Sequence, residues 1–201
     1  MRTSNKIAII KTLQKKEISL FTLADFSRLF AIDNRNTLYK KIQRLEKSEI
    51  IKRLTKGKYL FLLKKPNQFE IANFLYQPSY ISLESALSFY GILEQFPYQI
   101  TSVTTKKTKL YTFNQEPSFK YAQISQDFFW GYEKKESFLI ADKEKSLLDY
   151  LYLGSKGWRI LNLDKLRNQF DLSEINRKKL KNYYKMIKNP SFLKFLKKAK
   201  I

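Results

Sequence analysis

The stretch 33–61 constrains the fold most, because two different periodicities follow each other within it. Leu38, Ile42 and Leu45 are spaced by four and three residues, which is the spacing of one apolar face of a helix. Two runs rich in β-branched and aromatic residues follow, on either side of Gly57. Glycine permits the positive φ of a tight hairpin turn. The stretch therefore predicts a helix followed by a short hairpin.

Two shorter apolar stripes precede this stretch and predict two further helices. The first stripe consists of Ile7, Ile10 and Leu13, and the second of Leu23, Phe26, Leu29 and Phe30. Either Asp33 or Asn34 can cap the third helix, because a short oxygen-bearing side chain accepts hydrogen bonds from the free amides of a first turn. Three helices followed by a basic hairpin are typical of a winged helix-turn-helix. We predict this fold for residues 1–65.

The predicted third helix and hairpin carry residue types that suit DNA recognition. In a winged helix-turn-helix the third helix lies in the major groove, and hairpin cations contact phosphates. Arginine and asparagine can each form two hydrogen bonds with one base edge. The alternative is a solvated helix face that happens to be basic. The predicted DNA-binding residues are Arg35, Asn36, Tyr39, Lys40, Gln43, Arg44, Lys47, Lys52, Arg53, Lys56 and Lys58.

Positive charge is concentrated at the two ends of the chain. The formal net charge is +21, which divides into +12 for residues 1–65, −1 for residues 66–156 and +10 for residues 157–201. A general lysine bias would have raised the charge of the middle as well. Excess positive charge attracts polyanions by releasing their condensed counterions. Nucleic acid is therefore the expected partner, and an acidic protein is the second candidate.

The composition excludes several classes of function. The 201 residues include no cysteine and no histidine, which removes disulfides, thiol nucleophiles, zinc-thiolate sites and the commonest general base. No glycine-rich phosphate loop is present. We expect no catalytic residues, no metal and no cofactor. No apolar run approaches about 18 residues and the N-terminus lacks a signal-like stretch, so we expect a cytoplasmic chain that does not contact a membrane.

Beyond Pro66 the pattern predicts a mixed second domain, residues 66–201, and hence an α+β chain. The part 66–156 should contain a small, mainly antiparallel sheet with flanking helices, whereas the basic part 157–201 should be helical. Ser82 and Asp142 are expected to cap two of the helices. The β-prone runs are Gln99–Thr105, Leu110–Phe113, Phe119–Ser125, Phe128–Tyr132 and Phe138–Ala141.

The basic tail predicts helices over Leu163–Phe170, from Ser173 to about Ile187, and from Ser191 to about Lys198. Their apolar stripes should face a core, so their cations should form a second basic surface. We expect this surface to extend the DNA contact, with docking of a partner protein or its RNA as the alternative. Its residues are Arg177, Lys178, Lys181, Lys185, Lys194, Lys197 and Lys198.

Four segments in the middle of the chain resemble one known family. They are Pro78–Leu87, Tyr90-Gly91, Ile100–Lys107 and Ile140–Asp149. In order and approximate spacing they are similar to the AbiEi family of antitoxins and transcriptional regulators. Many relatives carry a histidine near Phe89 or Tyr90 and another near Tyr121. This chain has none, so no catalytic or metal-binding role is expected there.

The resemblance implies an antitoxin of a type IV, abortive-infection toxin–antitoxin pair that also represses its own operon. Its implied partners are double-stranded promoter DNA with inverted repeats and an AbiEii-like nucleotidyltransferase toxin, bound directly or indirectly. The alternative is a winged-helix regulator whose second domain senses a ligand or dimerises. An adjacent nucleotidyltransferase-like gene would favour the antitoxin.

Two other clusters have competing interpretations. Asp142, Glu144 and Asp149 could hold Mg²⁺ in a metal-dependent nuclease. Helix geometry argues against this, because Asp142 is placed as a cap and Glu144 suits the helix dipole. The aromatic run 128–130 could stack on single-stranded nucleic acid. Adjacent strand residues point to opposite faces, so at least part of this run should belong to the core.

Overall fold

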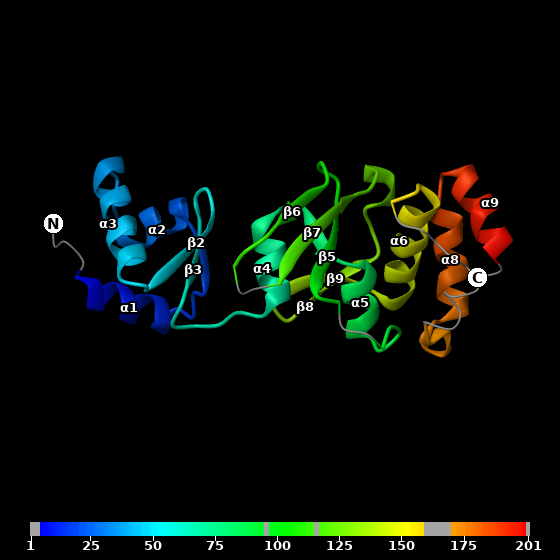
Figure 1. Cartoon of the computed structure of the whole chain (residues 1–201), viewed down its shortest axis with the longest axis horizontal. Coiled ribbons are helices and arrows are strands. Elements are labelled where there is room, and N and C mark those ends of the chain that lie inside the picture. The colour runs from blue at the N-terminus through cyan, green and yellow to red at the C-terminus, as the bar shows by residue number, and fades with distance from the viewer. Residues whose placement is uncertain (1–4, 95–96, 115–116, 159–169, 200–201) are drawn as a thin grey trace. The chain divides into compact units, whose positions relative to one another are not determined.

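A computed structural model of the chain describes residues 5–94, 97–114, 117–158 and 170–199 (Figure 1). The chain divides into two compact units, Met1–Leu75 and Tyr76–Ile201. One unit contains an antiparallel three-stranded sheet and the other a mixed six-stranded sheet, both with helices, so the predicted mixture of helices and sheets is confirmed. The predicted boundary after Lys65 differs from this division, because α4 (Gln68–Leu75) belongs to the first unit.

The first unit alternates helices with short strands. The sheet order is β1-β3-β2, with both pairings antiparallel. Strand β1 was not predicted, because its three residues continue directly into the apolar pattern of the next helix. The elements are α1 (Lys6–Lys15), β1 (Leu20–Thr22), α2 (Leu23–Phe30), α3 (Arg35–Lys47), β2 (Ile51–Thr55), β3 (Lys58–Phe61) and α4.

Side-chain caps fix where α2 and α3 begin. Thr22 and Asp25 form a reciprocal capping box at the start of α2, with each side chain bonded to the other residue's amide. Asn34, rather than Asp33, caps α3, since its side chain accepts from the Thr37 amide at 3.0 Å. The cap fixes the start of α3, and burial of Leu38, Ile42 and Leu45 determines which side chains face solvent.

The core of the first unit lies between its helices and its sheet. Leu38, Ile42 and Leu45 are buried there, as their spacing predicted. The stripe predicted for α1 is confirmed for Leu13 and Ile10 and wrong for Ile7, which is 60% exposed while Ile9 faces the core. The cluster consists of Ile9, Leu13, Phe21, Phe26, Ile32, Leu38, Ile42, Leu45, Ile50, Ile51, Tyr59 and Phe61.

The second unit is built on a mixed sheet of order β6-β7-β5-β4-β9-β8. Pairings β4–β5, β6–β7 and β8–β9 are antiparallel, and β5–β7 and β4–β9 are parallel. Strand β4 in the middle was not predicted, since its three residues give no periodicity. The elements are β4 (Ser79–Ile81), α5 (Leu83–Phe89), β5 (Gln99–Thr104), β6 (Lys109–Tyr111), β7 (Ser118–Gln123), η1 (Gln126–Phe128), β8 (Tyr132–Lys135), β9 (Phe138–Ala141), α6 (Lys143–Ser155), η2 (Leu172–Glu174), α8 (Arg177–Met186) and α9 (Pro190–Ala199).

The predicted strand 128–132 was wrong. A short 3-10 helix, η1, occupies its start, and β8 begins only at Tyr132. Gly131 breaks the run with a positive φ of 72°. A Cβ at this position would lie 2.9 Å from Cγ of Lys145, so the backbone approaches that lysine side chain closely. The apolar composition of the run reflects burial rather than a strand.

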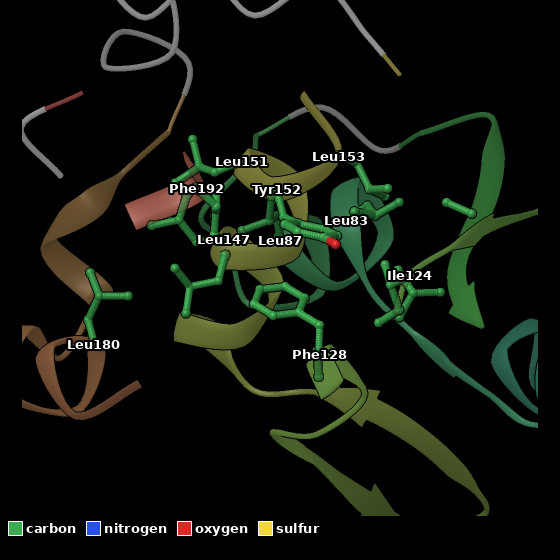
Figure 2. Packing of buried hydrophobic residues seen from close by; sticks show 14 of the residues in the cluster. Leu83, Leu87, Ile124, Phe128, Leu147, Leu151, Tyr152, Leu153, Leu180 and Phe192 are labelled. Carbon is green, nitrogen blue, oxygen red and sulfur yellow. The ribbon is translucent and has the colours of Figure 1, made fainter. Parts of the chain in front are cut away.

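Helix α6 is the centre of the second unit's core. It contacts α5, α8 and α9, and Figure 2 shows its Leu147, Leu151 and Tyr152 packed among residues from the neighbouring elements. Phe128 stacks on Tyr152 with ring centroids 4.4 Å apart. Figure 1 shows α6 between the sheet and α8. Helix α6 therefore fixes how the tail helices attach to the sheet.

The tail matches the predictions in part. Helix α8 begins at Arg177, later than predicted, because Asn176 rather than Ser173 caps it and accepts from the Lys178 and Lys179 amides. Helix α9 is confirmed with slightly wider bounds, since it begins at Pro190 rather than Ser191 and ends at Ala199. The predicted helix 163–170 lies, except for Phe170, outside the described residues. No helix in the described part of the chain is long and apolar enough to cross a membrane.

Candidate nucleic-acid interface

Helix α3 turns a polar, cationic face to solvent. Its apolar residues are buried, and the opposite face is exposed along the whole helix. Predicted DNA-binding residues on this exposed face are Arg35, Asn36, Tyr39, Lys40, Gln43, Arg44 and Lys47. The structure therefore brings together all seven residues predicted on this helix. A single straight helix presents them as one continuous surface.

The first turn of α3 carries an aromatic and cationic pair. The Arg35 guanidinium lies 5.8 Å from the centroid of the Tyr39 ring, and Tyr39 is 40% exposed. Lys40, Arg44 and Lys47 form no ion pair with any residue that the structure describes. No described residue of the unit therefore neutralises these charges, which favours attraction of a polyanion.

The hairpin of β2 and β3 is joined to the start of α2. Gly57 has a positive φ of 74° in the turn, and its carbonyl oxygen accepts from the Leu23 amide at 2.9 Å. Arg53 and Lys56 are exposed, whereas Lys52 is half-buried. The hydrogen bond holds the hairpin tip against the helices, so the exposed hairpin cations have a defined position.

Lys58 differs from the other predicted hairpin cations. Its Nζ donates to the carbonyl oxygens of Phe74 at 2.6 Å and Leu75 at 3.1 Å, at the C-terminus of α4. An ammonium group at that end of a helix satisfies unpaired carbonyls and interacts favourably with the helix dipole. We therefore expect Lys58 to have a structural role instead of the predicted phosphate contact.

Lys56 and Lys58 should consequently respond differently to substitution. Lys56→Ala should weaken binding to all DNA sequences alike and make the slope of log affinity against log salt shallower by about 0.9. Lys58→Ala should instead lower the free energy of unfolding by about 1.5–3 kcal/mol, as expected when a hydrogen bond to a charged group is removed. Salt-titrated DNA binding and urea unfolding of both variants measure these effects. Lower DNA affinity with unchanged stability in Lys58→Ala would contradict this assignment.

Two cations of this region were not among the predicted DNA-binding residues. Lys6 and Lys41 line a cavity of about 570 Å³ between α1 and α3, together with Arg44 and Lys47. Burial and then the nearby Arg44 lower the pKa of Lys41. An anion would relieve this repulsion. In the sequence, the only sign that Lys41 belongs to this region is that it directly precedes the buried Ile42. This neighbour places Lys41 at the margin of the core.

The predicted acidic group of the second unit is engaged by cations and hydroxyls. Asp149 is fully buried and forms an ion pair with the equally buried Lys145. Tyr80 Oη and Ser82 Oγ donate to the other carboxylate oxygen at 3.0 and 2.7 Å. Ser82 lies at the N-cap position of α5, but contrary to the prediction its side chain accepts no capping hydrogen bond, and its hydroxyl instead donates to Asp149. Burial raises the pKa of Asp149 and lowers the pKa of Lys145, and their attraction opposes both shifts.

The other two carboxylates tie α6 to α8. Asp142 caps α6 as predicted by accepting from the Lys145 amide at 2.8 Å. Lys179 Nζ lies 3.1 Å from Asp142 and 3.2 Å from Glu144. Tyr183 Oη donates to Asp142 at 2.5 Å. Among the residues that the structure describes, no three acidic side chains are grouped so that they could hold a metal ion.

Tyr183 should make stability depend on pH in the alkaline range. Burial and its hydrogen bond to Asp142 raise the pKa of Tyr183 to about 12, whereas an unfolded tyrosine ionises near about 10. Its contribution is fully present below about pH 10 and is lost as the pH rises through 12, because only the unfolded chain releases the proton in this window. Tyr183→Phe should reduce the decline in unfolding free energy measured between pH 9 and 11. Tyr98→Phe, at an 84% exposed position, is the control and should leave the decline unchanged.

The aromatic run 128–130 is used inside the unit. Phe128 is buried, and Trp130 packs against Tyr183 with centroids 4.9 Å apart. Nζ of Lys145 lies 4.0 Å from the Phe128 centroid and 4.8 Å from that of Trp130. The prediction that part of the run belongs to the core is confirmed. The aromatic faces solvate the buried ammonium.

The predicted second basic surface is exposed on two helices. Its members on α8 are Arg177, Lys178, Lys181 and Lys185, and those on α9 are Lys194, Lys197 and Lys198. Lys179 was rightly absent from this set, since it is paired with carboxylates of α6. Leu180 of α8 faces the core as predicted, and Phe192 and Leu196 of α9 are buried as well.

Comparison with known proteins does not decide between these surfaces. No family model matches this chain, and no curated protein does. The function is therefore inferred from the residues and their geometry, together with the resemblance of the four segments between residues 78 and 149.

Proposed function

We propose that residues 1–75 form a winged helix-turn-helix that binds promoter DNA. Helix α3 would enter the major groove, and the β2–β3 hairpin would be the wing. One observation carries this proposal: the whole outward face of α3 is polar or cationic, and its cations are not neutralised by described residues. The order of the elements and the charge of the hairpin also support the proposal, because three helices precede a hairpin with exposed Arg53 and Lys56.

The contacts would divide between sequence reading and charge. Arg35, Asn36 and Lys40 lie in the first half of α3, the part of a recognition helix that reaches base edges. Lys47 lies at the C-terminal end of α3, and the cavity lysines Lys41 and Lys6 lie on α3 and α1. These would contact phosphates, which contribute affinity without sequence preference.

We further propose that the chain is an antitoxin that represses its own operon. This part rests on the resemblance of the segments between residues 78 and 149 to the AbiEi family. The expected partners are promoter DNA with inverted repeats and an AbiEii-like nucleotidyltransferase toxin, neutralised directly or indirectly by the second unit.

Separating the two activities tests the proposal. The full chain and a variant with an altered α3 face are assayed for binding to the DNA upstream of their own gene. Both are also co-expressed with the product of an adjacent nucleotidyltransferase-like gene. The variant should lose DNA binding and still restore growth. Growth arrest in the presence of the folded full chain would favour a plain winged-helix regulator without an antitoxin role.

A further inference from the structure

A pocket of about 260 Å³ opens on the surface of the second unit between α6, η2 and α8. Leu147 and Leu180 form two of its walls, and Figure 2 shows them on α6 and α8. Both side chains are otherwise buried, so the pocket reaches into the edge of the core. Its apolar lining consists of Leu147, Leu172, Ile175, Leu180 and the ring of Tyr184.

Two cationic side chains line this pocket beside its apolar residues. Arg177 and Lys181 are one turn apart on α8, both are exposed, and both contribute to its lining. Neither forms an ion pair with a residue that the structure describes. The nearby carboxylates are already used, since Glu174 is paired with Lys143 at 2.5 Å and Glu144 with Lys179. The pocket therefore combines an apolar interior with positive charge that nothing in the described part of the chain neutralises.

We propose that this pocket docks an acidic segment of a partner protein. One apolar side chain of the segment fills the pocket, and flanking carboxylates pair with Arg177 and Lys181. This inference goes beyond the proposed function and does not depend on DNA binding or toxin neutralisation. It also assigns the α8 part of the second basic surface to a protein, where sequence reasoning favoured DNA.

The lining distinguishes a protein segment from nucleic acid. Bases stack on aromatic faces, but four of the five apolar lining residues are aliphatic. The volume of the pocket also argues for a single side chain, because it is smaller than the sites of drug-sized ligands, which are typically about 300–1,000 Å³. A single Leu, Ile, Phe or Met side chain fits the smaller volume. Insertion of one apolar anchor into such a pocket, surrounded by charge pairs, is the usual arrangement of an interface hot spot.

The probe is a pooled set of short synthetic peptides, each with one Leu, Ile, Phe or Met between Asp and Glu residues. Binding is followed on the full chain by methyl NMR signals of leucine and isoleucine. We expect shifts at Leu147, Leu172 and Leu180, and at least tenfold weaker binding when the anchor is replaced by alanine. If no peptide shifts these methyl signals, or if the alanine peptides bind equally well, the proposal is wrong.

Two matched charge-reversal variants locate the site. Arg177→Glu with Lys181→Glu should weaken peptide binding at least tenfold, whereas Lys178→Glu with Lys185→Glu should change it less than threefold. All four residues are exposed cations of α8, so both pairs change the net charge equally. Equal losses would reveal diffuse attraction rather than a docking site. A shallower salt dependence of promoter binding in the first variant, with peptide affinity unchanged, would make this a nucleic-acid surface instead.

Discussion

Asp149→Ala is expected to lower the unfolding free energy of the second unit by about 3–5 kcal/mol, the usual cost of removing one partner of a buried ion pair. The substitution leaves the Lys145 ammonium uncompensated in the core, and the hydroxyls of Tyr80 and Ser82 lose their acceptor. Since whole domains are stable by only about 5–15 kcal/mol, much of the unit should unfold at moderate temperature.

Urea unfolding followed by tryptophan fluorescence measures this effect, because both tryptophans, Trp130 and Trp158, lie in the second unit. Lys143→Ala is the control. It removes a partly exposed ion pair with Glu174, which should contribute less than about 1 kcal/mol. The double variant Lys145→Met with Asp149→Leu should recover the part of the loss that comes from the uncompensated charge, although the hydroxyls of Tyr80 and Ser82 still lack their acceptor. Equal stabilities of Asp149→Ala and Lys143→Ala would show that the ion pair contributes little.

Replacing Arg35, Asn36, Tyr39, Lys40 and Arg44 by alanine should reduce promoter affinity to that for unrelated DNA. Specific sites are typically bound at least about 10³-fold more tightly than non-specific ones. Removing each side chain that reads a base should contribute about 1–3 kcal/mol to this difference. The residues are exposed, so the stability of the unit should change little.

The control for this variant removes the same number of cations from α1 and its C-terminal cap. Lys11, Lys15 and Lys16 are exposed, and replacing them by alanine should lower affinity for all DNA equally while keeping the preference for the promoter. Competition binding with promoter and unrelated duplexes at several salt concentrations measures both quantities. A helix variant that still prefers the promoter would remove α3 from the reading surface.

Local periodicity made part of the fold predictable. The spacing of Leu38, Ile42 and Leu45 predicts a helix with one buried side. Gly57 predicts the turn in which it lies, because glycine permits the positive φ of that turn. Asp142 was predictable as a cap for the same reason, because capping involves residues three apart. Such features depend on the nearest turns of the chain and need no knowledge of the tertiary arrangement.

The interactions that could not be predicted join residues distant in sequence. Ser82 is placed to cap its helix, but the Ser85 amide donates to Thr101 Oγ1 instead, and the Ser82 hydroxyl donates to Asp149, 67 residues away. Lys58 resembles a phosphate-binding cation, and only the position of α4 shows that its ammonium is engaged. The pocket at Arg177 and Lys181 likewise arises from the packing of α8 on α6. Sequence identifies these charges but not the surfaces that they meet.

Because Gly131 approaches Lys145 so closely, we expect substitutions at these two positions to depend on each other. Any side chain at 131 would bring its Cβ to 2.9 Å from Cγ of that lysine, in a backbone conformation that already favours glycine. A lineage that loses this glycine must therefore also shorten residue 145, which would leave Asp149 without its cation. Position 149 must then change too. We expect Gly131, Lys145 and Asp149 to be kept together or replaced together. Covariation among the three positions would then identify related chains that share this core.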